Sequence, residues 1–153
     1  MGAVFVGLSE KEIELDALLR TVHAPSHGGQ VVFLGMVRDN NAGYAVRGMR
    51  YEAYRPLAEE VLKAIAAETQ SRWGAGLNIA IWHRIGELKL GEVSVAIVVG
   101  SPHRDEAFLA NRYIIEELKK RVPIWKEELY EDRDPVWLSG QPLLPESKDG
   151  RSL

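Results

Sequence analysis

The chain of 153 residues is long enough to bury the core of one domain, and its formal net charge of −3 argues against bulk nucleic-acid binding, which needs a strongly basic face. It has no cysteine, which excludes disulfides, thiolate metal ligands and any sulfur carried on a cysteine of this chain. Its four histidines show no spacing typical of a metal site. We therefore expect no metal, no cofactor and no nucleic-acid partner.

No boundary is visible along the chain, which has neither an internal repeat nor a linker. Residues 1–153 are therefore expected to form one domain, with a polar tail from about residue 145. The N-terminus lacks a basic leader and a small-residue cleavage site, and no apolar stretch has the length of a membrane span. These features favour a cytoplasmic protein that does not enter a membrane.

The N-terminal segment predicts a strand, a helix and a second strand. Residues 3–8 alternate weakly between apolar and polar, as a strand does. Ser9 with Glu12 is typical of a capping box, and the apolar stripe behind it predicts a helix up to about His23. Residues 30–37 are rich in β-branched and aromatic side chains, which favours a buried strand.

The middle of the chain begins with a polar turn over 38–45 and a strand over 46–54. Pro56 opens a helix at a position where its missing N–H does no harm, and this helix ends near Gly74. Two strands then flank a turn-prone segment over 86–92. The remaining predicted strands cover 77–85, 93–100, 124–129 and 136–138.

A third helix is predicted from Ser101 to Pro123, because the residue before a proline disfavours the helical conformation. The face expected to be apolar contains Ala107, Phe108, Asn111, Ile114, Ile115 and Leu118. The helices and strands together predict an α+β domain with a mostly antiparallel sheet and flanking helices.

Two groups of basic residues stand where ligands commonly bind. Arg38 follows a buried strand, although an arginine in such a loop is more often a solvated surface residue. His103 and Arg104 begin a helix, whose N–H groups and dipole favour an anion such as phosphate. A capped helix start with solvated charges explains this pair equally well. For His83 the structural interpretation, a residue inside a strand, is favoured.

Two lysines stand on either side of Pro123. Lys119 lies about 20° from Phe108 on a helical wheel and so borders the apolar face, where it acts as a base or nucleophile or merely covers the edge of the core. In the following strand, alternation places Lys126 and Glu128 on one face and Glu127 on the other. The proline turns the chain, so that the two lysines are able to converge.

Five segments taken in order resemble one known family. They read FLGMVRDNNAG, YEAY, HRIGELKLGE, SPHRDEAF and LKKRVPIWKEE. Together they are similar to the large, catalytic subunit of molybdopterin synthase, the MoaE family, from about residue 28 to about residue 138. The resemblance implies an α/β-hammerhead fold and a homodimer, which becomes a heterotetramer with a small ubiquitin-like sulfur-carrier subunit.

The resemblance also implies the reaction and its residues. Sulfur passes from a thiocarboxylate on the carrier's C-terminal Gly-Gly tail to cyclic pyranopterin monophosphate and forms the dithiolene of molybdopterin, a step of molybdenum cofactor biosynthesis. The catalytic residues of the family fall on Lys119 and Lys126. Those that bind substrate fall on Met36, Val37, Arg38, His103, Arg104, Glu127 and Glu128. Some members carry a basic residue where this chain has Met36, so a charge contact from that position is in doubt.

Elementary chemistry agrees with this reading, because an enzyme without cysteine must receive its sulfur from a partner, and both the thiocarboxylate and the phosphate are anions. Arg104 and Lys119 are fifteen residues apart on one predicted helix, which separates their backbones by roughly 22 Å. We therefore expect two chains to share one site. Two rival functions remain: a non-enzymatic anion- or nucleotide-binding module, and an adaptor that docks a ubiquitin-like tail.

Overall fold

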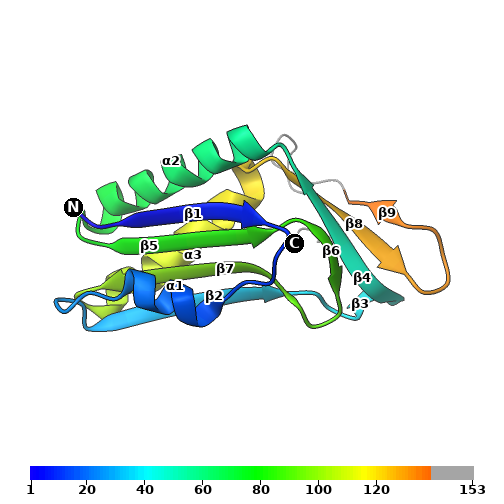
Figure 1. Ribbon diagram of the computed structural model, residues 1–153, viewed down its shortest axis with the longest axis horizontal. Coiled ribbons are helices and arrows are strands. Elements are labelled where there is room, and N and C mark those ends of the chain that lie inside the picture. Colours follow the sequence, from blue (N-terminus) through cyan, green and yellow to red (C-terminus); the bar gives the residue numbers. More distant parts are fainter. Residues whose placement is uncertain (139–153) are drawn as a thin grey trace.

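The computed structural model describes residues 1–138 and arranges them as two sheets with three helices (Figure 1). The strands are β1 (Val4–Ser9), β2 (Gly29–Met36), β3 (Asn40–Asn41), β4 (Tyr44–Ala53), β5 (Asn78–Arg84), β6 (Gly86–Lys89), β7 (Val93–Ser101), β8 (Ile124–Tyr130) and β9 (Val136–Trp137). The helices are α1 (Leu15–Val22), α2 (Arg55–Trp73) and α3 (Arg104–Arg121). The polar tail predicted from about residue 145 lies outside the described residues.

The first sheet has the order β1-β5-β7-β2, in which β1 runs parallel to β5 and the other pairs are antiparallel. Its two faces bury different side chains because neighbouring residues of a strand point to opposite sides. Ile79 and Ile81 join the main core with α2 and α3, whereas Ala80 and Val98 pack against Val22 of α1. Figure 1 shows α1 on one side of this sheet and α3 on the other.

The second sheet places β4 between β3 and β8, with β9 at the far edge of β8 and β6 also paired to β4. Its β3–β4 hairpin has a two-residue turn in which Ala42 and Gly43 both adopt positive φ, 52° and 86°. This pair of conformations suits the twist of a tight hairpin. The predicted α+β class, with mostly antiparallel sheets and flanking helices, is confirmed.

Several local predictions were wrong. The strand predicted to be buried over 30–37 is the edge strand β2, and none of its residues from Gly29 to Met36 is fully buried. No capping box forms at Ser9, because Ser9 pairs with Arg84 as the last residue of β1 and the helix begins only at Leu15. The turn-prone segment contains strand β6, which is stabilised by pairing with the distant β4. Phe108 of α3 is 60% exposed, since the face that packs on the sheet is formed by Ala107, Ala110, Asn111, Ile114 and Leu118.

None of the three helices in residues 1–138 combines the length and the hydropathy of a membrane-spanning segment.

A buried amide fastens α3 to the first sheet. The side-chain N–H₂ of Asn111 donates to the carbonyl oxygens of Val31 at 2.9 Å and Ile97 at 3.0 Å. Both of these oxygens belong to strands, one in β2 and the other in β7. Asn111 thus ties the helix to two neighbouring strands beside the pocket described below.

We predict that Asn111→Leu, which keeps the volume but loses both donors, lowers the free energy of unfolding by about 2 kcal/mol, because two buried carbonyl oxygens lose a partner. Urea unfolding followed by circular dichroism measures this change. The neighbouring Arg112→Ala removes only an exposed ion pair with Glu116 and serves as the control, with an expected change below about 0.5 kcal/mol. Equal stability of the two variants would contradict the role given to Asn111.

Candidate active site

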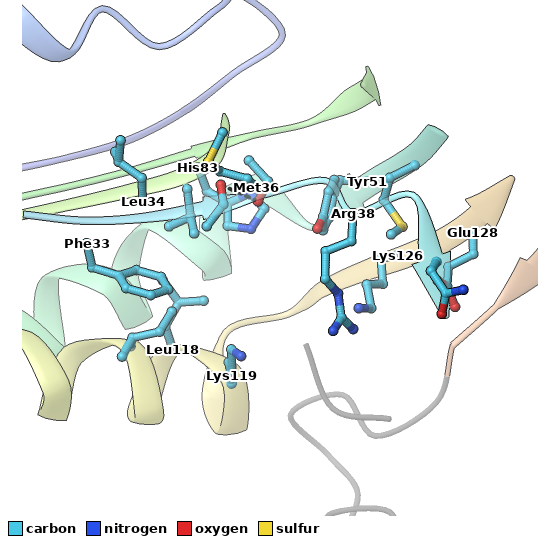
Figure 2. A pocket seen from close by; sticks show the side chains of 16 residues that line it. Phe33, Leu34, Met36, Arg38, Tyr51, His83, Leu118, Lys119, Lys126 and Glu128 are labelled. Atoms are coloured by element: carbon cyan, nitrogen blue, oxygen red, sulfur yellow. Dashed lines mark hydrogen bonds between the residues drawn. The ribbon is translucent and has the colours of Figure 1, made fainter. Parts of the chain in front are cut away.

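A pocket of about 400 Å³ lies where the end of α3 meets both sheets (Figure 2). Its lining residues come from β2, β3, β4, β5, β7, α3 and β8 and from the loop between β2 and β3. The pocket therefore depends on contacts between segments that are far apart in the sequence. Apolar side chains such as Phe33 and Leu118 form part of its wall, and polar groups are concentrated on the strands.

Three cationic side chains line this pocket: Arg38, Lys119 and Lys126. Arg38 is exposed, Lys119 is half-buried at the end of α3, and Lys126 is buried with 7% exposure. Burial lowers the pKa of Lys126 to about 8, and the positive charges of Lys119 and Arg38 act in the same direction, whereas Glu128 opposes them. The exposed Lys120 next in sequence pairs instead with Glu117.

The alternation predicted along β8 is confirmed. Lys126 and Glu128 both line the pocket, while Glu127 forms an ion pair with Arg50 and does not line it. Glu128 is held by two donors, the side-chain amide of Asn41 at 2.6 Å and the hydroxyl of Tyr130 at 3.0 Å. A buried carboxylate with two hydrogen bonds is a fixed negative charge beside the Lys126 ammonium group.

Met36 and Val37, at the end of β2, lie in different environments. The register of the strand shifts between Gly35 and Met36, and Met36 lines the pocket with 55% of its surface exposed. Val37 is buried in the main core and is not among the lining residues. Its backbone N–H donates to the carbonyl oxygen of Glu92 at 3.0 Å, so its place in this chain is structural.

His103 and Arg104 are not brought to this pocket. Both are exposed and line a separate shallow depression with Gly28, Pro102 and Asp105, at the start of α3. Lys119 lies in the last turn of the same helix. Fifteen residues of α-helix separate the two ends by roughly 22 Å. Within one chain the structure thus forms two sites, one at each end of α3.

Four polar residues that line the pocket were not predicted from the sequence: Asn40, Tyr51, His83 and Ser94. His83 had been given a purely structural place, yet it lines the pocket while it is buried, and burial lowers its pKa to about 4. The period of β5 carried a signal, since His83 shares its parity with Ile79 and Ile81, which face α2 and α3. No local pattern in the sequence indicated that this face of β5 contacts the second sheet.

The family model described as MoaE protein matches residues 8–121. The chain belongs to the MoaE family. The molybdopterin synthase catalytic subunit of Synechococcus elongatus is 43% identical over 148 residues, which cover 95% of this chain and 90% of the relative.

Two solved structures show the same fold in this family. A crystal structure of molybdopterin synthase from Staphylococcus aureus is 38% identical, with a TM-score of 0.82 over 86% of this chain and 95% of that one. A chain from Helicobacter pylori is 19% identical, with a TM-score of 0.70 over 89% and 90% of the two chains. It belongs to a protein–protein complex of subunits 1 and 2 of molybdopterin-converting factor. The fold expected from the resemblance is confirmed.

We predict that Lys126 titrates near pH 8, well below the ordinary lysine value of 10.5. NMR of the lysine side chains measures this, with Lys126→Met to assign the signal. Glu128→Gln is expected to lower the pKa further and Lys119→Met to raise it, because the first removes a negative and the second a positive neighbour. An unperturbed titration near 10.5 would contradict the burial of the ammonium group.

The lowered pKa of Lys126 also makes the free energy of unfolding depend on pH. Between pH 8 and pH 10.5 the unfolded chain binds more protons at Lys126 than the folded chain does. The free energy of unfolding of the wild type, measured relative to Lys126→Met, is therefore expected to rise across that window and to level off above it. A flat difference in urea unfolding over this range would contradict the shift.

Proposed function

We propose that this protein is the catalytic subunit of a molybdopterin synthase. In this proposal it transfers sulfur from the thiocarboxylated C-terminus of a small ubiquitin-like carrier to cyclic pyranopterin monophosphate, and two transfers form the molybdopterin dithiolene. The observation that carries the proposal is the pocket where Arg38, Lys119 and Lys126 converge in a chain without cysteine. Such a pocket attracts anionic sulfur from a partner and cannot supply sulfur itself.

The bonds that form and break in each transfer suggest a role for each of the three cations. A bond forms between the sulfur and a side-chain carbon of the pterin, while a C–O bond at that carbon breaks and its oxygen leaves as water or as an oxygen of the phosphate. The acyl C–S bond of the carrier then breaks as water adds to the acyl carbon, which leaves the tail as a carboxylate and the sulfur on the pterin, with no change of oxidation state. Arg38 and Lys119 offset the negative charge that the tail carries before and after the step. Lys126 has a pKa of about 8, so its neutral form is accessible near neutral pH and accepts a proton.

Glu128 lines the pocket from the same face of β8 as Lys126 and stabilises the lysine's positive charge. Its carboxylate is fixed by Asn41 and Tyr130, and its charge favours the protonated form of Lys126. Glu127 lies on the opposite face of β8 with Arg50, so we assign it no contact with substrate from this chain. Met36 offers an apolar contact at the rim.

The separation of the two ends of α3 supports a homodimer with shared sites. His103 and Arg104 of one copy then bind the phosphate, while Lys119 and Lys126 of the other act at the sulfur. An apolar groove along the middle of α3 contains Val32, 37% exposed, and Leu109, 53% exposed, and a second copy of the chain would cover it. One carrier on each copy gives a heterotetramer, in keeping with the two-subunit complex of the Helicobacter pylori relative.

The rival functions make different predictions in one assay. Incubation with thiocarboxylated carrier and cyclic pyranopterin monophosphate yields a dithiolene if the protein is the enzyme. Binding of either ligand without turnover supports the anion-binding module or the adaptor instead. We also propose that the reaction takes place in the cytoplasm, which cell fractionation tests.

We predict that Lys119→Ala and Lys126→Ala each lower the rate of dithiolene formation by about a hundredfold or more, while stability changes by only about 1 kcal/mol. The matched control is Lys120→Ala, which removes an exposed lysine from the same helix end and is expected to leave the rate unchanged. Near-normal turnover by either folded active-site variant would refute the assignment.

Mixing two inactive variants tests the shared site. Arg104→Ala and Lys119→Ala are expected to be inactive alone and to recover about a quarter of wild-type activity when mixed equally, because half of the dimers are then heterodimers with one intact site of two. Subunit exchange is verified by mass spectrometry of the native dimers. Exchange without recovery would exclude the shared site and leave Arg104 as a helix-capping charge.

A further inference from the structure

The hydrogen bond of His83 decides where its proton lies. Its Nδ1 is 2.6 Å from the carbonyl oxygen of Arg84, and a carbonyl oxygen can only accept. Nδ1 therefore carries the proton, and Nε2 of the neutral ring keeps a lone pair. Burial lowers the pKa of His83 to about 4, which keeps the ring neutral at physiological pH. His83 is thus a hydrogen-bond acceptor rather than a charge or a base.

Two hydroxyls also belong to this pocket, those of Ser94 and Tyr51. The Ser94 hydroxyl donates to the carbonyl oxygen of Gly35 at 3.2 Å. The side-chain interaction with Ser94 acts to lower the pKa of Tyr51, against the effect of burial. The Tyr51 oxygen has lone pairs, and its ring packs edge-on against His83 with 4.9 Å between centroids.

These acceptors lie in the wall of the same pocket as the cations. His83, Tyr51 and Ser94 all line it, and within residues 1–138 the hydrogen bond of the His83 ring is made through Nδ1 rather than Nε2. Figure 2 shows His83 on the strand side of the pocket, away from Lys119 at the helix end. A lone pair that faces the pocket can accept a hydrogen bond from a donor of the pocket's ligand.

We propose that His83 is a substrate-binding residue whose Nε2 accepts a hydrogen bond from an N–H group of the ligand, with the Tyr51 oxygen as a second acceptor beside it. The inference rests on the proposed function, which supplies two ligands with such donors: the N–H groups of the pterin ring and the peptide N–H groups of the carrier tail. The pocket thus binds an anion at its cationic side and a donor-bearing face at its neutral side.

Two substitutions of His83 separate this role from packing. In His83→Asn the side-chain amide still reaches the Arg84 carbonyl, but the acceptor toward the pocket is gone. In His83→Gln the amide ends near the position of Nε2 and offers an acceptor to the ligand. We expect His83→Asn to weaken binding about tenfold and His83→Gln to bind within about threefold of the wild type.

Calorimetry with the full chain measures binding in two arms. One uses cyclic pyranopterin monophosphate alone, and the other uses the carrier with its unmodified Gly-Gly carboxylate. The arm in which His83→Asn loses affinity identifies the source of the donor. Unchanged affinity in both arms, or equal losses in His83→Asn and His83→Gln, would overturn the proposal.

Nitrogen NMR of histidine in the wild type gives a readout that does not depend on how a variant folds. We expect His83 to show a protonated Nδ1 and a bare Nε2 in the free protein, and the Nε2 signal to move when the ligand binds. A protonated Nε2, or a signal that neither ligand moves, would sink the inference. Failure of the wild type to form dithiolene would instead overturn the proposed function. The histidine signals would still decide whether His83 binds the ligand.

Discussion

The pocket depends on a lysine that is held out of water. Transfer of an ammonium group from water into a protein interior costs several kcal/mol unless partners and geometry offset it. Lys126 is 7% exposed, and the partner with the opposite charge is Glu128 on the same face of β8. Glu128 is in turn held by Asn41 from the β3–β4 hairpin. The tight hairpin turn, the register of β4 on β8 and the burial of Lys126 are therefore linked.

Burial lowers the pKa values of both Lys126 and His83 and gives these two groups different chemistry. It brings Lys126 into the range where a proton is exchanged near neutral pH, and it carries His83 so low that the ring remains neutral. The two groups differ in the charges near them. Glu128 offsets part of the desolvation of Lys126, whereas His83 gains only a hydrogen bond to a backbone carbonyl. One pocket thus has a cationic side and a neutral, accepting side.

Helix α3 extends from the depression lined by His103 and Arg104 to the pocket lined by Lys119. It is a straight segment from Arg104 to Arg121, anchored in the middle by Asn111 on two strands. Its rigidity prevents Arg104 from folding back toward Lys119 of the same chain, since the rise per residue of an α-helix is constant. The exposed apolar groove along the middle of α3 is where a second copy completes the arrangement in our proposal.

Local features of the sequence determined much of this protein. The α+β class, the bounds of α2 and α3, and the opposite faces of Lys126 and Glu127 all follow from periods and from prolines, which act within a few residues. The convergence of Lys119 with Lys126 was expected from the proline between them, whereas the addition of Arg38 was expected only from the family resemblance. The alternation of β5 indicated the side of the sheet on which His83 lies, but not that this side borders the pocket. Strand β6 and the end of β1 at Ser9 were decided by tertiary structure alone, because each depends on a partner strand distant in sequence, whose contribution no local pattern records.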